Sequence, residues 1–354
     1  MCYAAAMDGQ QRSEGSGEEA RAHLRALVAA TFGEPVPPGE PIPGGGSERR
    51  FFRFAHPRGS VVGVHARHAA ETRAFLGFTR HFAARGIPVP RLYAADEARG
   101  LYLLEDLGPH TLAGRLRAWR AAGDEARCLA ALETVVRWLP AIQVRGGAGL
   151  DYGLCHEGDA LGAEAFRADV ARFETAYLAR HAPAFRPDAA VRAGLAALIA
   201  ELDAVPRPYF CYRDFQTRNV MWRDDAPVFL DYQSGRRGAL HYDLASLLYS
   251  PDSGLDDAGR DRLVTAYLEA LADCGERPQP TAFRATLARF ALVRRLQALG
   301  AYAHLARREG SEDFRARIPG ALADLRGLVA AGAATAGLPA LHRWLEAWLE
   351  GRRL

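Results

Sequence analysis

The apolar pattern of this chain changes its period near residue 108. Before that point, short β-like runs alternate with turns and one helical stretch; the runs are RRFFRFA, SVVGVHA, RLYAA and LYLLE. After it, apolar residues recur at helical spacing over 111–144, 160–182, 189–203, 256–273, 281–308 and 338–349. Strands in the first third and helices in the rest predict an α+β protein with two lobes, because the two patterns bury their apolar faces in different ways.

We expect a small, β-rich N-terminal lobe at residues 19–106 and a large, mainly helical C-terminal lobe at residues 107–354. Residues 1–18 are small, polar and rich in Gly and Ser, which predicts a disordered extension. One segment interrupts the helical lobe. Between Tyr209 and Asp231, the runs YFCY, NVMW and VFLDY have the character of short strands with polar residues at their ends.

Composition and charge exclude several kinds of protein. The net charge is only +3, from 45 basic and 42 acidic residues, and no dense basic run is present, so no nucleic-acid partner is expected. No apolar run reaches about 18 residues, and the N-terminus has neither a basic start nor an apolar core, so we expect no membrane span and no signal peptide. The five cysteines are scattered without a C-x-x-C pair, which argues against a disulfide framework or a zinc site. A monomer in the cytoplasm is the expectation.

All 45 basic residues are arginine, and Asn219 is the single asparagine. A GC-rich genome accounts for both, because the codons of lysine and asparagine are poor in G and C. The missing lysine excludes a Walker-type phosphate loop and a Schiff-base mechanism. An asparagine retained against such a bias marks a position where a short neutral amide is needed.

The segment YRDFQTRN places Asp214 five positions before Asn219, and VFLDYQ places Asp231 at the end of an apolar run. Phosphoryl transfer needs this set of groups: one carboxylate orients or deprotonates the acceptor hydroxyl, while an amide and a second carboxylate hold the magnesium ions on the nucleotide phosphates. The pattern R-D-x-x-x-x-N followed by an acid resembles the catalytic loop and metal-binding Asp of protein-kinase-like enzymes. Any one of these residues alone could simply cap a turn, and the joint pattern favours the catalytic interpretation.

The segment GGGSERRFFRF supplies a glycine-rich turn before the first long strand. Backbone N–H groups of such a turn approach phosphates, and four polar side chains follow it. We therefore predict a nucleotide-binding set made of Ser47, Arg49, Arg50 and Arg53. The segment LYLLEDLG reads as the last strand of the small lobe entering a connector, and adenine binding in this fold uses main-chain groups there, so Glu105 and Leu107 complete the set.

Taken together, these segments resemble the aminoglycoside phosphotransferase superfamily of small-molecule kinases, and within it the anomeric N-acetylmuramate and N-acetylglucosamine kinases, which feed sugar 1-phosphates to cell-wall recycling. The resemblance runs from about residue 44 to residue 319 and includes FLDYQSGRRGALHYDLASLLYSP and VRRLQALGAYAHLARREG. It implies a protein-kinase-like bilobal fold. It also implies ATP or GTP as co-substrate, Mg²⁺ as cofactor and a small-molecule acceptor.

The resemblance also implies roles for single residues. Asp214 carries over as catalytic base with Arg213 beside it, Asn219 and Asp231 as magnesium ligands, and Asp243 as a structural acid behind the active-site loop. The acceptor set implied for the large lobe consists of Asp214, Arg218, Arg294, Arg295 and Gln297, with Tyr302 on the same helix.

Three departures from the family pattern affect these implications. Tyr212 stands where many relatives have histidine, Gln216 differs from the residue more usual in the amino-sugar kinases, and the small-lobe lysine that pairs with the α and β phosphates is missing. Arginine can bind phosphate bidentately where lysine acts as a point charge. The hypothesis is therefore that Arg49, Arg53 or Arg67 takes the role of that lysine, steadied by Glu71.

The predicted function is transfer of the γ-phosphoryl group of ATP or GTP to a hydroxyl of an amino sugar, most simply its anomeric hydroxyl. One alternative is the same chemistry on an aminoglycoside, choline or another small alcohol; a cationic acceptor calls for a carboxylate cluster, whereas Arg294 and Arg295 favour a neutral or anionic one. A second alternative is a nucleotide-binding regulatory module without turnover, which the missing lysine would suit. A protein kinase is disfavoured because no A-P-E segment follows Asp231.

Overall fold

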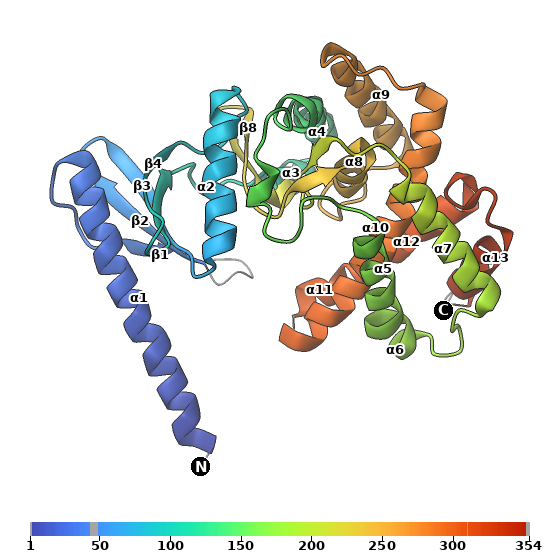
Figure 1. Cartoon of the computed structure of the whole chain (residues 1–354), viewed down its shortest axis with the longest axis horizontal. Coiled ribbons are helices and arrows are strands. Elements are labelled where there is room, and N and C mark those ends of the chain that lie inside the picture. The colour runs from blue at the N-terminus through green and yellow to red at the C-terminus, as the bar shows by residue number, and fades with distance from the viewer. Residues whose placement is uncertain (1, 43–48, 310, 352–354) are drawn as a thin grey trace.

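A computed structural model describes residues 2–42, 49–309 and 311–351. Figure 1 shows a sheet with one long helix at one end of the molecule and a group of helices at the other, with a further helix lying between them. None of the described helices is long and apolar enough to cross a membrane.

The small lobe is built on a five-stranded antiparallel sheet with the order β1-β2-β3-β5-β4. The strands are β1 (Glu40–Ile42), β2 (Arg50–His56), β3 (Gly59–His65), β4 (Leu92–Asp96) and β5 (Leu101–Glu105). Side chains alternate across β2: Phe52 and Phe54 pack with Leu24 and Val28 of α1 (Cys2–Phe32), whereas Phe51 packs against the main core on the other face. This alternation also places Arg53 on the face away from α1.

Helix α2 (Ala69–Ala84) lies against the other face of the sheet and joins it to the large lobe. Phe75 of α2 stacks on Tyr102 of β5 and on Tyr232 of the large lobe, in each case with 5.3 Å between ring centroids. The hydroxyl groups of Thr79 and Tyr232 are 2.6 Å apart in a hydrogen bond. These contacts fix α2, and the acid Glu71 in its first turn, relative to Asp231.

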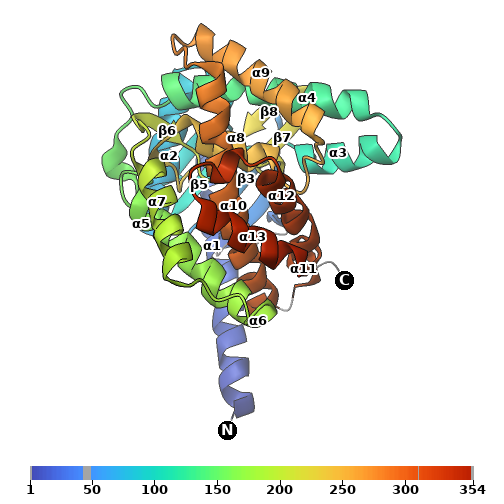
Figure 2. The same ribbon diagram turned by 90° about the vertical axis from the view of Figure 1, so that its right-hand side faces the viewer.

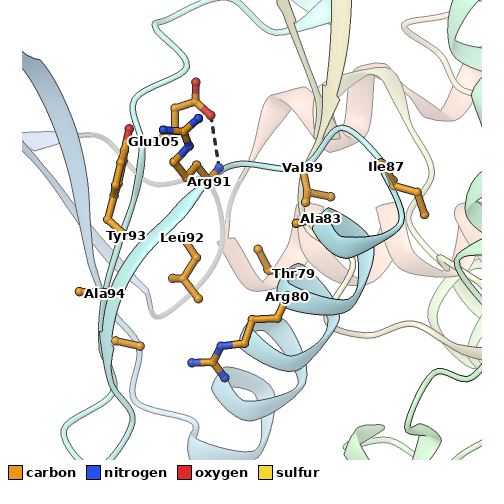
Figure 3. Close-up of a pocket in the computed structure, with 12 residues that line it drawn as sticks. Thr79, Arg80, Ala83, Ile87, Val89, Arg91, Leu92, Tyr93, Ala94 and Glu105 are labelled. Atoms are coloured by element: carbon orange, nitrogen blue, oxygen red, sulfur yellow. Dashed lines mark hydrogen bonds between the residues drawn. The ribbon is translucent and has the colours of Figure 1, made fainter.

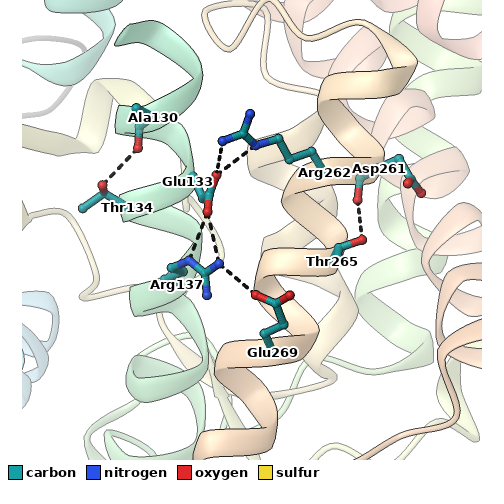
Figure 4. A network of polar contacts seen from close by, with 8 residues as sticks. All are labelled: Ala130, Glu133, Thr134, Arg137, Asp261, Arg262, Thr265 and Glu269. Atoms are coloured by element: carbon teal, nitrogen blue, oxygen red, sulfur yellow. Dashed lines mark hydrogen bonds and ion pairs between the residues drawn. The ribbon is translucent and has the colours of Figure 1, made fainter. Parts of the chain in front are cut away.

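The large lobe is helical, as its pattern predicts. Its α-helices are α3 (Leu112–Ala121), α4 (Glu125–Pro140), α5 (Ala163–Arg172), α6 (Ala179–His181), α7 (Ala189–Asp203), α8 (Leu240–Leu248), α9 (Asp257–Asp273), α10 (Pro280–Glu309), α11 (Glu312–Ala316), α12 (Ile318–Ala330) and α13 (Pro339–Glu350). Helix α10 is the longest of them, and α5, α8 and α12 pack along it (Figure 2). Surface ion pairs add to one contact: Arg137 of α4 lies 2.8 Å from Glu269 of α9, and Arg262 of α9 lies 2.9 Å from Glu133 of α4 (Figure 4).

Two short hairpin-like pairs interrupt these helices. β6 (Tyr209–Cys211) pairs with β9 (Arg236–Gly238), and β7 (Val220–Arg223) pairs with β8 (Ala226–Phe229), both antiparallel. The strands predicted from YFCY, NVMW and VFLDY are therefore confirmed, as are those predicted from RRFFRFA, SVVGVHA, RLYAA and LYLLE.

Several elements differ from the sequence interpretation: β1, β9, α11 and α12 were not predicted, and two further differences concern α1 and α8. Residues 2–18, expected as a disordered extension, are the first half of helix α1, which the strong helix formers Ala4–Ala6 and Glu18–Ala20 favour. Helix α8, in HYDLASLL, was not among the predicted helices, because it is only nine residues long and its apolar run directly follows the strand-like segment before it.

Candidate active site

The catalytic-loop sequence lies between β6 and β7, and a buried acid holds its backbone. Arg213 has a left-handed backbone with φ +77°, which costs a non-glycine residue about 1–2 kcal/mol. The carboxylate of Asp243, on α8, accepts hydrogen bonds from the backbone N–H of Tyr212 at 2.7 Å and of Arg213 at 2.9 Å. Burial raises the pKa of Asp243 to about 6. These bonds bear out the structural role expected of Asp243, which sets the direction in which the next residue, Asp214, leaves the loop.

The side chain of Asp214 is half-buried and available. Its carboxylate makes no hydrogen bond with a described residue, and neither oxygen is sealed from solvent. It lies close enough to Arg213 for the two charges to interact, and this attraction contributes to a raised pKa of Arg213 together with the nearby Tyr242. An unpaired, accessible carboxylate at the tip of a constrained loop is able to accept a proton from a bound hydroxyl group.

Asn219 and Asp231 lie together beneath this loop. The Asn219 side-chain N–H donates to the Asp214 carbonyl at 2.8 Å, and the backbone N–H of Leu230 donates to the Asn219 carbonyl at 2.9 Å. The second bond ties the end of β8 to the loop and so brings Asp231 to it. Asp231 has a left-handed backbone, with φ +67°, and its Oδ1 accepts a hydrogen bond from Gln233 at 2.9 Å.

The donor set of this pair fits Mg²⁺. Because the amide nitrogen of Asn219 is engaged, its Oδ1 is the atom left to act as a ligand, and amide and carboxylate oxygens are the protein ligands that Mg²⁺ takes. Within the part of the chain that the structure describes, no group of three or more His, Cys, Asp and Glu side chains is arranged to hold a metal. Two protein ligands suit a site that is completed by nucleotide phosphates and water.

Of the three arginines considered as replacements for the missing lysine, Arg49 reaches this site. Its Nη2 lies 2.6 Å from Asp231 Oδ1, and its Nε lies 3.8 Å from Glu71 Oε1 on α2. Its side chain is 15% exposed, so these charges are poorly screened by water. Desolvation opposes the charge on Arg49, but Asp231, Tyr102 and Glu71 together outweigh it, so the pKa of Arg49 is raised. The triad Arg49–Glu71–Asp231 joins the small lobe, α2 and the end of β8.

Arg53 has a different partner. Its guanidinium binds both carboxylate oxygens of Asp106, at 2.6 and 3.1 Å, and Ser60 donates to the same acid at 2.8 Å. Asp106 lies between Glu105, which ends β5, and Leu107, which is buried in the connector between the lobes. Arg53 therefore fixes the connector expected at the adenine end of the site, away from Asp231.

The remaining predicted nucleotide-binding residues are less informative. Arg50 is half-buried at the start of β2, opposite His65 of β3. The side chain of Glu105 is already bound by Arg223 at 2.8 Å, so only its main chain is left for a nucleotide contact. Ser47 lies outside the described residues.

The acceptor residues implied on α10 lie on two different sides of the helix, because consecutive residues of a helix point about 100° apart. Arg294 is buried and donates to Tyr242 at 3.2 Å, to Ser246 at 2.7 Å and to Gln297 at 2.5 Å. Its guanidinium interacts electrostatically with the Asp214 carboxylate. Arg294 and Gln297 thus lie on the side of α10 that faces the catalytic loop.

Arg295 and Arg218 do not join that group. The side chain of Arg295 is 2% exposed, and its Nη1 lies 3.5 Å from Asp324 Oδ2 on α12. It therefore points away from the catalytic loop and is not placed to contact an acceptor. Arg218 is exposed in the 3-10 turn Thr217–Asn219, and Tyr302 stacks on Phe314 with 6.3 Å between ring centroids.

Sequence reasoning missed two residues near the loop. Asp169 is 8% exposed on the buried face of α5, and Gln233, 5% exposed, binds Asp231. A signal for Asp169 was present, because it falls among Phe166, Val170 and Phe173 at helical spacing, where an acid has no packing role. No sequence pattern marked Gln233 as a site residue, apart from its position two residues after Asp231.

A separate cavity of about 620 Å³ lies between α2 and β4 (Figure 3). It is lined by side chains that include Arg80, Ile87, Val89, Arg91, Leu92 and Tyr93. Glu105 is its only lining residue that belongs to the predicted site, and Asp214 and Asp231 do not line it. The cavity is therefore not the place of the candidate chemistry.

An antiparallel small lobe and a helical large lobe that carries the loop with Asp214 and Asn219 define a protein-kinase-like fold. The match to known families agrees. The model of the phosphotransferase enzyme family matches residues 38–285, and this chain belongs to that family, whose members transfer phosphoryl groups to hydroxyl acceptors.

Among curated proteins, the N-acetylmuramate/N-acetylglucosamine kinase of Pseudomonas aeruginosa is 28% identical over 301 residues, which cover 83% of this chain and 84% of that kinase. The kinase of the same name from Caulobacter vibrioides is 28% identical over 264 residues, which cover 71% and 69%. Among solved structures, a choline/ethanolamine kinase family protein from Mesorhizobium loti has a TM-score of 0.59 at 16% identity and covers 92% of this chain and 99% of its own. Amicoumacin kinase hAmiN, solved with AMP-PNP, Ca²⁺ and Ami, has a TM-score of 0.54 at 12% identity, with coverages of 86% and 93%. At such identities the structures show the fold alone.

Proposed function

We propose that this protein transfers the γ-phosphoryl group of ATP or GTP to the anomeric hydroxyl of an amino sugar of the N-acetylglucosamine or N-acetylmuramate type. The observation that carries the proposal is the convergence of Asp214, Asn219 and Asp231 at one loop, with the cation of Arg49 beside them. Phosphoryl transfer depends mainly on positioning and on neutralising charge, and this set of groups supplies both.

Each residue has one task in this proposal. Asp214 accepts the proton of the acceptor hydroxyl as the hydroxyl oxygen attacks the γ-phosphorus; the bond from this phosphorus to the β–γ bridging oxygen breaks, and ADP or GDP leaves. Arg213 lies beside that carboxylate. Asn219 Oδ1 and the Asp231 carboxylate would hold Mg²⁺, which would neutralise charge on the phosphates. Arg49 binds a phosphate oxygen in place of the missing lysine, and Glu71 keeps its guanidinium in position.

Binding at the adenine end rests on the connector between the lobes. The main chain from Glu105 to Leu107 contacts the base, and the pair between Arg53 and Asp106 keeps that segment against β2 and β3. Arg50 is the arginine of this set with the weakest support.

Two observations support an uncharged or anionic sugar over a cationic alcohol. The curated relatives that cover most of this chain carry the name N-acetylmuramate/N-acetylglucosamine kinase. In addition, the side of the loop that faces α10 holds the guanidinium groups of Arg213 and Arg294 beside the carboxylates of Asp169 and Asp214, so it has no excess of carboxylates that would attract a cation.

The test is ATP and GTP turnover with Mg²⁺ across a panel of N-acetylglucosamine, N-acetylmuramate, glucose, choline and kanamycin. Phosphorus NMR of the product locates the new phosphate. We expect turnover with the N-acetylated sugars and a signal from an anomeric phosphate. Turnover with kanamycin alone would replace the amino-sugar assignment by an aminoglycoside, and absence of stimulation by any acceptor would favour a regulatory nucleotide-binding module.

A further inference from the structure

Asp169 is an acid in a place where packing has no use for one. It lies on α5 between Phe166 and Val170, on the helix face that is buried against the core, and it is 8% exposed. The other acid of this helix, Glu164, is exposed to solvent, as acids on helices usually are. A carboxylate loses much of its hydration in such a position, so a compensating partner is expected.

That partner is missing among the described residues. The Asp169 carboxylate makes no hydrogen bond and no ion pair with them, and its two oxygens are nevertheless not sealed from solvent. The guanidinium of Arg213 is in the same condition: it is largely buried, makes no hydrogen bond or ion pair with a described residue, and lies 6.0 Å from the ring of Tyr242. Asp214 is the third such group. Three charged side chains thus have unused hydrogen-bonding capacity within reach of solvent.

These groups form one cluster around the ring of Tyr242. The ring of Phe166, one helical turn before Asp169, lies 6.4 Å from it between centroids, the Arg213 guanidinium lies 6.0 Å from it, and Arg294 donates to its hydroxyl at 3.2 Å. The charges of Arg213, Arg294 and Asp214 all act on Asp169, and desolvation together with Asp214 raises its pKa above the ordinary range of an aspartate. Arg294 forms the inner wall of the cluster, because its own hydrogen bonds go to the neutral groups of Tyr242, Ser246 and Gln297. The neighbouring pair of Arg236 and Glu157 satisfies itself and adds no net charge.

We infer that Asp169 accepts hydrogen bonds from hydroxyl groups of the acceptor and so determines the specificity of the site for an uncharged polyol. The inference rests on the proposed function, because it places the acceptor against Asp214. A carboxylate with two free oxygens binds a pair of neighbouring hydroxyl groups well, and the guanidinium of Arg213 offers donors to the hydroxyl and carbonyl oxygens beside them.

The charge balance of the cluster explains the selection. Arg172 also acts on Asp169, but it is exposed and its charge is screened by water. The remaining two guanidinium groups and two carboxylates, those of Arg213, Arg294, Asp169 and Asp214, leave little net potential, so neither a cationic nor an anionic acceptor gains from long-range attraction. The affinity for an acceptor therefore depends on its hydrogen bonds with Asp169 and Arg213. Removing the carboxylate of Asp169 leaves the two guanidinium groups in excess and shifts the preference toward an anion.

The experiment compares Asp169→Asn with the control Glu164→Gln, which removes an exposed acid from the same helix. The probes are N-acetylglucosamine, which is neutral, and N-acetylmuramate, which carries a carboxylate. KM and kcat are measured for each sugar and for ATP, together with melting temperature. ATP hydrolysis in the absence of a sugar reports on the nucleotide half of the site.

We expect Asp169→Asn to raise the KM for N-acetylglucosamine about tenfold or more, the effect of losing a hydrogen bond to a charged group. The KM for ATP and sugar-independent hydrolysis should stay within about twofold, and the ratio of kcat/KM for N-acetylmuramate to that for N-acetylglucosamine should rise, while Glu164→Gln changes none of these. An unchanged sugar KM, or a parallel fall of kcat with both sugars and of melting temperature, would assign Asp169 a purely structural role and overturn the inference. Wild-type protein that phosphorylates neither sugar would instead overturn the proposed function.

Discussion

The replacement of the missing lysine by Arg49 can be tested by removing its side chain. In Arg49→Ala, Asp231 loses a cation at 2.6 Å and the phosphates lose a charged donor. A hydrogen bond to a charged group contributes about 1.5–3 kcal/mol, so the loss of one bond to a phosphate corresponds to about 10- to 150-fold in kcat/KM for ATP. Because Arg49 is 15% exposed and Glu71 is 26% exposed, screening by solvent removes only part of this effect.

Two further variants make the test specific. Arg49→Lys keeps the charge but presents a compact ammonium in place of a planar fork, so it cannot repeat the two contacts to Asp231 and Glu71, and it should recover only part of the activity. Arg53→Ala breaks the pair with Asp106 instead and should affect kcat/KM for ATP less than Arg49→Ala does.

The assay is steady-state turnover at saturating sugar with ATP varied, together with a direct Kd for a non-hydrolysable ATP analogue. Folding is checked by circular dichroism and melting temperature. If Arg49→Ala retains wild-type kcat/KM for ATP while Arg53→Ala loses it, the cation that binds the phosphates is Arg53 of β2 and not Arg49, and the reasoning fails.

Three other variants test the loop and the core behind it. Asp214→Asn should lower kcat about 10²- to 10⁴-fold with little change in the Kd for ATP, because only the proton acceptor is removed; titration calorimetry and initial rates measure the two effects. Asp243→Asn replaces one acceptor oxygen by an NH₂ donor that faces the backbone N–H groups of Tyr212 and Arg213, which costs about 1–3 kcal/mol. Melting temperature and kcat should therefore fall together. An unchanged kcat would show that the loop keeps its conformation without these two hydrogen bonds. Burial lowers the pKa of His241 to about 3, so below pH about 6.5 the unfolded chain binds a proton at this residue and the folded protein does not. Between pH 7.5 and pH 5, wild type should therefore lose about 2 kcal/mol more free energy of unfolding than His241→Phe. Urea unfolding measures this difference, and an equal loss in both proteins would contradict it.

Much of this site could be predicted because its residues lie close together in the chain. Asp214 and Asn219 are five positions apart on one loop, and Asp231 ends the next strand pair, so local spacing was enough to bring them together. The lobes followed from the change of period near residue 108. Helix α8 did not, because a short apolar run of nine residues cannot be told from a buried strand by its period alone.

Other features depend on packing between distant segments, which spacing cannot show. Arg294 and Arg295 are neighbours in sequence, but the rotation of α10 turns one toward the loop and the other toward Asp324. Asp169 lies 45 residues before Asp214, and only the packing of α5 along α10 brings its charge to the loop. The pair Arg53–Asp106 is likewise made by tertiary structure, because the connector passes beside β2 and β3.

The register of the small-lobe sheet supports the proposal that Arg49 supplies the cation for the phosphates. In protein kinases the corresponding lysine is on β3, but the positions of β3 that face α2 and the large lobe here are Val62 and Val64, both packed in or against the core. Phe51 pairs with Val64, and Arg49 is two residues before Phe51, so its side chain leaves the same face of the sheet just beyond the paired end of β2. From there a long guanidinium reaches Asp231 and Glu71 without charging the apolar face of β3. Moving the cation back, in the double variant Arg49→Ala with Val64→Lys, should therefore restore ATP turnover relative to Arg49→Ala alone. A double variant that folds but remains as inactive as Arg49→Ala would show that this face of β3 no longer points at the phosphates.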